Sequence, residues 1–179
     1  PTAKAIGAVN VIRREFDGRL IGHNTDAEGF AQSLRPFLTG DHHRAMVIGA
    51  GGAAAAVRYA LTQLGIEVVH LVRRDLSEET PYRWARLESI EAESVKHFRL
   101  LVQATPVGTA PDVKATVDFP WEGITDRHFA VDLIYNPKTT EFLKRAKARG
   151  AMTLNGTDML HLQAERSWEF WTRHSPSNA

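Results

Sequence analysis

The fold of this chain is decided by the stretch from Ala45 to Leu64, which reads AMVIGAGGAAAAVRYALTQL. It begins with a short apolar run, Met46 to Ile48, that suits a buried strand. Small residues follow, and an alanine-rich run then continues to Leu64, where Gly65 provides a typical helix end. The stretch therefore predicts a strand, a glycine turn and a helix in immediate succession.

The turn between that strand and helix has the composition of a phosphate-binding loop. A pyrophosphate can approach a helix N-terminus only where side chains leave the backbone accessible. Gly49 permits a tight turn, Ala50 is small, Gly51 and Gly52 clear the approach, and Ala53 lets the helix pack closely on the strand. Its placement between a strand and a helix favours dinucleotide binding over a purely conformational role.

The end of the next apolar run indicates which dinucleotide is bound. An NAD site usually carries an acidic residue about 20 residues after the first glycine, where it binds the ribose 2′-hydroxyl. Here Val72 is followed by Arg73 and Arg74, whose guanidinium groups suit a 2′-phosphate. The pattern predicts NADP, although Asp75 could serve NAD if the strand ended later.

Further apolar runs alternate with helix-like segments along the chain. We expect strands at residues 66–72, 100–103, 129–134 and 152–154, and helices at residues 139–148 and 157–172. In the first of these helices Phe142, Leu143 and Ala146 should face inward. Residues 76–96 remain ambiguous. The alternation predicts the α/β class, with a Rossmann-type doubly wound parallel sheet.

The first 44 residues carry a different pattern. Two β-favouring runs, residues 5–12 and 19–22, flank Asp17-Gly18 and suggest a hairpin. Thr25 followed by Glu28 resembles a capping box, and predicts a helix that stops before Pro36. We expect the loop at residues 41–44, with its adjacent histidines His42 and His43, to be solvated and to bind no metal.

Composition excludes several functional classes. The 179 residues are 43% hydrophobic and 24% charged, as in an ordinary globular protein, and the net charge of +1 gives no field that would attract nucleic acid or a membrane. There is no cysteine, and no apolar run approaches the roughly 20 residues that span a bilayer. We expect a cytoplasmic protein with a small-molecule partner. Since the chain starts at Pro1 and a strand is expected almost at once, we also expect a fragment of a longer protein.

Six segments of the chain, in order, resemble those of shikimate dehydrogenases. These segments are Gly7-Ala8-Val9-Asn10, Asn24-Thr25-Asp26, Gly49-Ala50-Gly51-Gly52-Ala53, Ala104-Thr105-Pro106-Val107-Gly108, Asp132-Leu133-Ile134-Tyr135-Asn136-Pro137, and Gly156-Thr157-Asp158-Met159-Leu160 with Gln163. The resemblance covers nearly the whole chain. It implies reversible reduction of 3-dehydroshikimate to shikimate with NADPH, within the pathway to aromatic amino acids.

The resemblance also implies residue roles. It places Asn10, Asp26, Tyr135 and Gln163 toward the substrate, with Asp26 sharing acid–base catalysis with a lysine. The implied cofactor contacts are Gly49, Ala50, Gly51, Gly52 and Ala53 at the turn, Arg73 and Arg74 at the 2′-phosphate, and Thr105, Leu133, Gly156 and Met159 beside the nicotinamide half. Local sequence alone would instead make Asp26 a helix cap.

The implied organisation divides the chain into three parts. Residues 1–26 would be the remnant of a substrate-binding lobe, residues 27–155 the NADP-binding domain, and residues 156–179 a helix that returns to the substrate lobe. The family's catalytic lysine and its carboxylate-binding serines lie upstream of Gly7, and Lys4 is not in a matching motif. We therefore expect the missing N-terminal lobe to be the partner of this chain, and the chain to be inactive alone.

Two alternatives remain open from the sequence. One is a quinate or shikimate dehydrogenase that prefers NAD, because Val72 replaces the polar residue often found before the 2′-phosphate arginine. The other is a dinucleotide-binding module without catalysis, which the absent lysine keeps possible.

Overall fold

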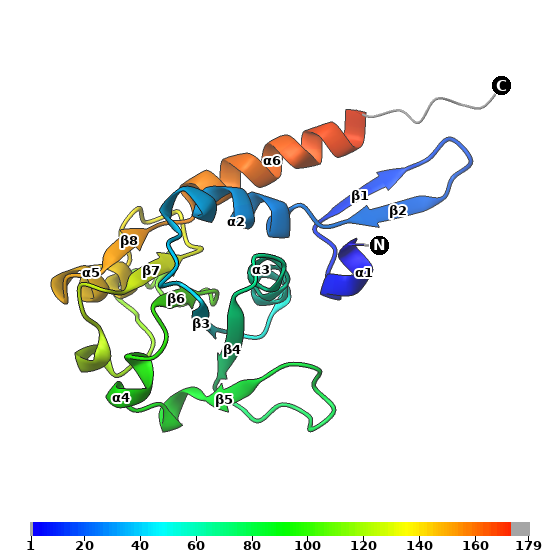
Figure 1. The fold of residues 1–179 in the computed structure, drawn as a ribbon. Coiled ribbons are helices and arrows are strands. Elements are labelled where there is room, and N and C mark those ends of the chain that lie inside the picture. The colour runs from blue at the N-terminus through cyan, green and yellow to red at the C-terminus, as the bar shows by residue number, and fades with distance from the viewer. Residues whose placement is uncertain (1, 173–179) are drawn as a thin grey trace.

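The computed structural model describes residues 2–172, and its centre is a parallel β-sheet (Figure 1). In the described part of the chain this sheet has six strands in the order β5-β4-β3-β6-β7-β8, and every neighbouring pair is parallel. The strands are β3 (Arg44–Ile48), β4 (Glu67–Val72), β5 (Trp84–Arg86), β6 (Leu100–Gln103), β7 (Phe129–Asp132) and β8 (Met152–Leu154). This confirms the predicted doubly wound sheet.

Helices cover both faces of this sheet. The α-helices are α1 (Thr2–Ile6), α2 (Asp26–Leu34), α3 (Gly52–Gln63), α4 (Ala92–Val95), α5 (Glu141–Ala148) and α6 (Thr157–Thr172), and the short 3-10 helices are η1 (Arg35–Phe37), η2 (Leu87–Ser89) and η3 (Trp121–Gly123). Strand β3 divides its side chains between two cores: Ala45 and Val47 pack with α2 and α3, whereas Met46 and Ile48 pack with α5. This alternation explains why the strands are apolar throughout.

The strand order places a crevice beside β3. The chain runs from β3 outward through β4 and β5, then crosses back to β6 on the other side of β3 and continues to β8. At such a switch point the loops that follow neighbouring strands diverge, and ligands of open α/β sheets bind in the resulting crevice. The glycine turn directly follows β3, so it lies at this point.

A small hairpin projects from the main body (Figure 1). Strands β1 (Val11–Arg14) and β2 (Leu20–His23) pair antiparallel, with Val11 opposite His23. The C-terminal end of α6 holds this hairpin: the Arg13 guanidinium donates to the Phe170 carbonyl at 2.7 Å, and the Trp171 indole donates to the Ile12 carbonyl at 3.0 Å. The predicted hairpin is therefore present, and it contacts the last turns of α6.

The start of the hairpin differs from the prediction. Residues 5–12 were expected to form one strand, but Thr2–Ile6 is a helix and the strand begins at Val11. The Gly7 N–H donates to the Ala3 carbonyl and Gly7 has φ of 77°, a conformation that ends helices at glycine. The reversal at Gly7 separates the helical turn from the strand.

The capping box predicted for α2 is wrong. Thr25 occupies the N-cap position without a side-chain cap hydrogen bond, and the Ala27 N–H is instead accepted by Asn24 Oδ1 at 3.2 Å. Glu28 pairs with Arg166 at 2.9 Å rather than folding back on the helix start. Packing of α2 against α6 thus redirects both members of the predicted box.

Two loops also differ from the expectations. His42 is buried, and its Nδ1 accepts the Thr39 N–H at 3.0 Å, so only His43 of the pair is exposed. The ambiguous residues 76–96 contain the edge strand β5, the 3-10 helix η2 and the short α4. Within residues 2–172, no helix is both long and apolar enough to cross a membrane.

Candidate functional site

A cleft of about 480 Å³ opens at the carboxyl ends of β3, β4 and β6. It is lined by six of the residues that the sequence assigned to the cofactor: Gly49, Ala50, Gly51, Arg73, Arg74 and Thr105. Because parallel strands end at one edge of the sheet, three segments that are far apart in sequence meet here. Gly52 and Ala53 begin α3 directly behind the turn and are not among the described residues that line the cleft.

The glycine turn has the geometry that close approach of a ligand requires. Gly49 has φ of 119°, and a Cβ on it would lie 3.2 Å from the Ala104 carbonyl oxygen. A Cβ on Gly51 would meet no described atom within 4 Å, so the space in front of this residue belongs to the cleft. No side chain caps α3 at Gly51, which leaves the positive end of a 12-residue helix available to an anion.

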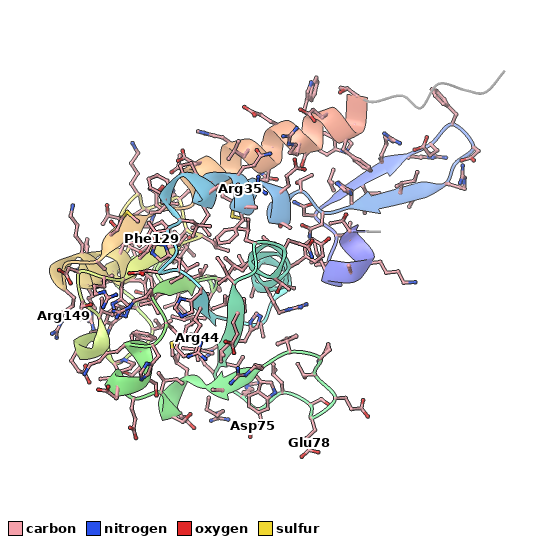
Figure 2. All side chains as sticks on the ribbon, in the orientation of Figure 1. Arg35, Arg44, Asp75, Glu78, Phe129 and Arg149 are labelled. Atoms are coloured by element: carbon pink, nitrogen blue, oxygen red, sulfur yellow. The ribbon has the colours of Figure 1, made fainter. Side chains whose placement is uncertain are left out.

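The basic end of the cleft follows β4. This strand ends at Val72, so Arg73 and Arg74 are the first residues of the loop, and both are exposed. Asp75 lies on the same loop (Figure 2), and its Oδ1 is 3.4 Å from Arg86 Nη1. The acidic candidate for an NAD-type contact is therefore paired with an arginine of β5.

Thr105 is fixed by a buried glutamine at the end of β6. Gln103 Oε1 accepts hydrogen bonds from the Thr105 N–H at 2.6 Å and from its hydroxyl at 2.7 Å. Gln103 Nε2 donates to the Val107 carbonyl at 2.9 Å. This side chain, which sequence reasoning did not single out, holds the loop that forms one wall of the cleft.

Leu133, Gly156 and Met159 lie outside the lining of this cleft. A Cβ on Gly156 would overlap the Leu133 carbonyl, and the Gly156 N–H donates to the Ile134 carbonyl at 3.1 Å. Met159 is buried in the core cluster against which Leu133 packs. Gly156 thus lies against Leu133, and none of the three residues is among the described residues that line the cleft of Gly49 and Arg73.

A polar cluster joins the hairpin, α2 and α6. Asn10 Nδ2 donates to Asp26 Oδ1 at 2.8 Å and to the Thr25 hydroxyl at 2.9 Å, while Asn10 Oδ1 accepts the Thr25 N–H at 2.9 Å. The Thr25 hydroxyl also lies 3.0 Å from the Ser167 hydroxyl and 3.4 Å from Gln163 Oε1. The structure thus brings together Asn10, Asp26 and Gln163, three of the four residues assigned to the substrate.

Asp26 is a partly buried carboxyl group with a raised pKa. Partial burial raises the pKa of its carboxyl group, and the hydrogen bond from Asn10 opposes that increase. Among the described residues no cation forms a salt bridge with it, and Lys4 is exposed. The described residues therefore give Asp26 a hydrogen bond from Asn10 but no ionic partner.

The fourth residue assigned to the substrate lies apart from this cluster. Tyr135 is on the loop after β7, half of its side chain is exposed, and in the described region it makes no hydrogen bond to Asn10, Asp26 or Gln163. The structure does not join it to the other three.

Sequence reasoning missed two polar residues that organise the cluster. Thr25 is fully buried and is the centre of its hydrogen bonds, and Ser167 is buried on α6, where its hydroxyl donates to the Gln163 carbonyl at 2.9 Å. Thr25 stood in a quoted motif but was assigned to capping. Ser167 had no sequence signal, because only the packing of α6 on α2 brings it to Thr25.

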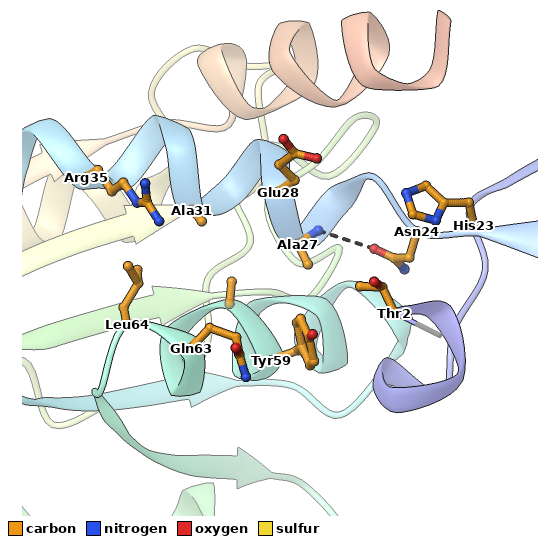
Figure 3. Close-up of a pocket in the computed structure, with 11 residues that line it drawn as sticks. Thr2, His23, Asn24, Ala27, Glu28, Ala31, Arg35, Tyr59, Gln63 and Leu64 are labelled. Carbon is orange, nitrogen blue, oxygen red and sulfur yellow. Dashed lines mark hydrogen bonds between the residues drawn. The ribbon is translucent and has the colours of Figure 1, made fainter. Parts of the chain in front are cut away.

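A smaller cavity of about 180 Å³ lies between α2 and α3 (Figure 3). Small side chains such as Ala27, Ala31 and Ala60 leave it open, and Glu28 and Arg35 border it. Its lining shares no residue with the cleft of the glycine turn. We assign it no role.

Comparisons with known proteins find relatives over nearly the whole chain. No family model matches the chain. It is 37% identical over 187 residues to the NADP-dependent shikimate dehydrogenase of Desulforamulus reducens, covering 96% of this chain and 64% of that relative. It is 31% identical to the enzyme of the same name from Bacillus cereus, covering 99% of this chain and 67% of that relative.

Solved structures give the same result. Shikimate 5-dehydrogenase from Thermus thermophilus, in complex with NADP(H) and shikimate, superposes with a TM-score of 0.81 and 39% identity. The match covers 96% of this chain and 65% of that structure. The chain therefore spans about two thirds of the length of the proteins it resembles.

Proposed function

Because this chain belongs to the shikimate dehydrogenase family, we propose that it is the cofactor-binding part of an enzyme that reversibly reduces 3-dehydroshikimate to shikimate with NADPH. One observation carries this proposal: a single cleft joins the glycine turn to Arg73 and Arg74. Its two ends match the two charged ends of the adenosine half of NADP, the pyrophosphate and the 2′-phosphate.

The residues around the cleft fit that cofactor. The open space in front of Gly51 and the uncapped N-terminus of α3 suit the pyrophosphate, together with Gly49, Ala50, Gly52 and Ala53 of the same turn. Arg73 and Arg74 would bind the 2′-phosphate by bidentate, charge-assisted hydrogen bonds. Thr105, which lines the cleft, would border the nicotinamide half of the cofactor, together with Leu133, Gly156 and Met159, which lie outside the cleft lining.

The position of Asp75 favours NADP over NAD in this proposal, because this carboxylate is poorly placed to bind the ribose of NAD. An NAD site usually carries a carboxylate that accepts a hydrogen bond from the ribose 2′-hydroxyl. Asp75 lies three residues beyond the end of β4 and pairs with Arg86 at 3.4 Å. The first side chain after the strand is the guanidinium of Arg73, which is attracted to a phosphate.

The polar cluster of Asn10, Asp26 and Gln163 would bind the substrate and exchange a proton with it. NADPH, when bound, supplies the hydride. Asp26 would hold or release a proton at the substrate oxygen, and Asn10 and Gln163 would orient the hydroxyl groups, with Tyr135 also facing the substrate. Burial raises the pKa of the Asp26 carboxyl group, which favours its protonated form and so supports a role in proton transfer. A lysine would complete the acid–base pair from outside this chain.

The exposed residues of the hairpin are evidence for a second, substrate-binding lobe. Ile12 and Leu20 are 58% and 69% exposed on neighbouring strands, and α6 returns from the main body to contact them. We therefore assign residues 1–26 and 156–179 to a substrate-binding lobe, and residues 27–155 to the NADP-binding domain. The remainder of that lobe would be the partner that covers the hairpin, and the absence of cysteine fits a reducing cytoplasm.

Calorimetric titration of the chain with NADP⁺ and NAD⁺ tests the cofactor assignment. We expect NADP⁺ to bind tenfold to about a hundredfold more tightly, since a hydrogen bond to a charged group contributes about 1.5 to 3 kcal/mol. Arg73→Ala and Arg74→Ala should weaken NADP⁺ binding and leave NAD⁺ binding unchanged.

Arg149→Ala is the matched control. Arg149 is an exposed arginine between α5 and β8, the strand at the opposite edge of the sheet from β5 (Figure 2). Its replacement should leave both affinities unchanged. Equal affinity of the unaltered chain for the two cofactors would contradict the NADP assignment.

A further inference from the structure

His70, on β4, occupies a position that an aliphatic residue would fill more simply. Its neighbours Val69, Leu71 and Val72 are buried apolar residues, and the His70 side chain is only 1% exposed. The ring lies 4.6 Å from that of Tyr82, measured between centroids. An imidazole in this setting has two polar nitrogens that need partners.

Within residues 2–172, only one of these nitrogens has a hydrogen-bond partner. His70 Nδ1 lies 2.7 Å from the Gly49 carbonyl oxygen, whereas Nε2 is buried and has no hydrogen-bond partner among the described residues. A carbonyl oxygen only accepts, so Nδ1 carries the hydrogen. Burial and the nearby charge of Arg58 lower the pKa of His70, which keeps the ring neutral. The buried, unpaired Nε2 lowers the stability of the folded chain, whereas a leucine at this position would bury no polar atom.

The paired nitrogen acts on the glycine turn. Gly49 is held twice: its N–H donates to the Leu71 carbonyl at 2.9 Å, and its carbonyl accepts from His70. In a trans peptide the C=O and the following N–H point in opposite directions. Because His70 draws the Gly49 carbonyl toward the core, the Ala50 N–H must point away from it, toward the cleft that Ala50 lines.

We infer that His70 is a positioning residue that orients the Gly49–Ala50 peptide so that the Ala50 N–H is presented to the pyrophosphate of the cofactor. This rests on the proposed dinucleotide site. It explains why a buried imidazole with an unpaired nitrogen stands in an apolar strand. If His70 had a purely structural role, its replacement by leucine would lower stability. We expect no such loss, since the ring contributes an unsatisfied polar atom to the core.

Binding to His70→Leu tests the inference. The chain should remain folded, with a thermal midpoint equal to or above that of the unaltered chain. Its Kd for NADP⁺ should rise about tenfold, which corresponds to one charge-assisted hydrogen bond. The Kd for NAD⁺ should rise by the same factor, because the two cofactors share the pyrophosphate. The Kd for adenosine 2′-monophosphate, which has no pyrophosphate, should not change.

Two further variants complete the experiment. His70→Asn places an amide N–H near the position of Nδ1 and should restore most of the NADP⁺ affinity. His128→Leu is the matched control, because His128 is also 1% exposed but bonds to Thr125 and Val95, and neither lines the cleft. It should leave the affinity unchanged.

The outcomes separate this inference from the proposed function. If the unaltered chain binds no dinucleotide, the proposed function is wrong. If it binds NADP⁺ and His70→Leu binds equally well, or if His70→Leu fails to fold, the positioning role is overturned while the cofactor site stands. Weaker binding of adenosine 2′-monophosphate by His70→Leu would equally overturn it, because the effect would then not be confined to the pyrophosphate.

Discussion

Asp132 shows how one side chain can join two elements near the site. It is fully buried at the end of β7, where its Oδ2 accepts from the Thr140 hydroxyl at 2.5 Å and its Oδ1 accepts from the Ile134 N–H at 3.0 Å. The Thr140 hydroxyl in turn accepts the Leu143 N–H at the start of α5. Burial raises the pKa of Asp132 to about 6, and the two hydrogen bonds oppose that increase.

This pKa predicts how stability depends on pH. A carboxyl group whose pKa is higher in the folded state than in the unfolded state favours folding when protonated. Its contribution is therefore complete below about pH 4 and is lost as pH rises to about 6, on the order of 3 kcal/mol from the difference in pKa. Asp132→Asn, which cannot ionise, should lose this dependence.

The measurement is chemical denaturation of both proteins between pH 4 and pH 8. The free energy of unfolding of the unaltered chain, minus that of Asp132→Asn, should fall between pH 4 and pH 6 and stay constant above pH 7. A constant difference over the whole range would show that Asp132 ionises normally. Taking the difference between the two proteins removes the contribution of Asp26, whose pKa is also raised.

At the scale of elements, the close contact of α2 with α6 assembles the polar cluster. Gly29 on α2 faces α6, and a Cβ on it would lie 2.9 Å from the backbone nitrogen of Gln163. This approach allows the Thr25 hydroxyl to reach Ser167 at 3.0 Å. The helices α2 and α6 can approach this closely because Gly29 has no side chain.

Gly29→Ala should therefore destabilise the chain. In an unconstrained helix this change stabilises by about 1 kcal/mol, because alanine is the better helix former. Here the added methyl group must push α6 away, and overpacking of this kind costs about 1 to 3 kcal/mol. Thermal or urea unfolding gives the sign directly. Gly40→Ala is the control, since a Cβ there meets no described atom within 4 Å, and a stabilised Gly29→Ala would refute the close-contact argument.

At the scale of the whole molecule, the described residues form the proposed cofactor cleft but only part of the proposed substrate site. Hydride transfer requires the cofactor and substrate to be held within reacting distance of each other. The described residues supply Asp26 and Asn10 but no lysine salt bridge to Asp26. The chain covers 64% of the length of its Desulforamulus relative.

We predict that the isolated chain binds NADP⁺ but does not oxidise shikimate, whereas the protein that includes the N-terminal lobe does. In that longer protein Asp26→Asn should lower kcat about 10² to 10⁴-fold, as loss of a general acid–base group does. Spectrophotometric assay of NADPH formation measures both effects. Asp118→Asn, at an exposed aspartate, should leave the rate unchanged.

Two results would contradict this prediction. Turnover by the isolated chain would mean that the acid–base partner of Asp26 lies within these residues. A near-normal rate for a folded Asp26→Asn variant would return Asp26 to a structural role at the start of α2.

Local chemistry explains what could be read from the sequence. The strands at Leu100–Gln103 and Met152–Leu154 and the helix at Thr157–Thr172 lie where the sequence predicted them, because their apolar periodicity and helix starts are encoded within each segment. The meeting of Gly49 with Arg73 and Arg74 was also predictable, since it follows from the parallel connection of β3 to β4.

Contacts between distant elements were decided only by the tertiary structure. Thr25 was interpreted as a helix cap, but its hydroxyl turns toward Ser167, 142 residues later in the chain. Asp75 is paired by Arg86, and His70 by the Gly49 carbonyl, and neither pair has a local sequence signature. A residue's type and near neighbours limit which hydrogen bonds it can form, but the packing of helices and strands determines which partner comes within hydrogen-bonding distance.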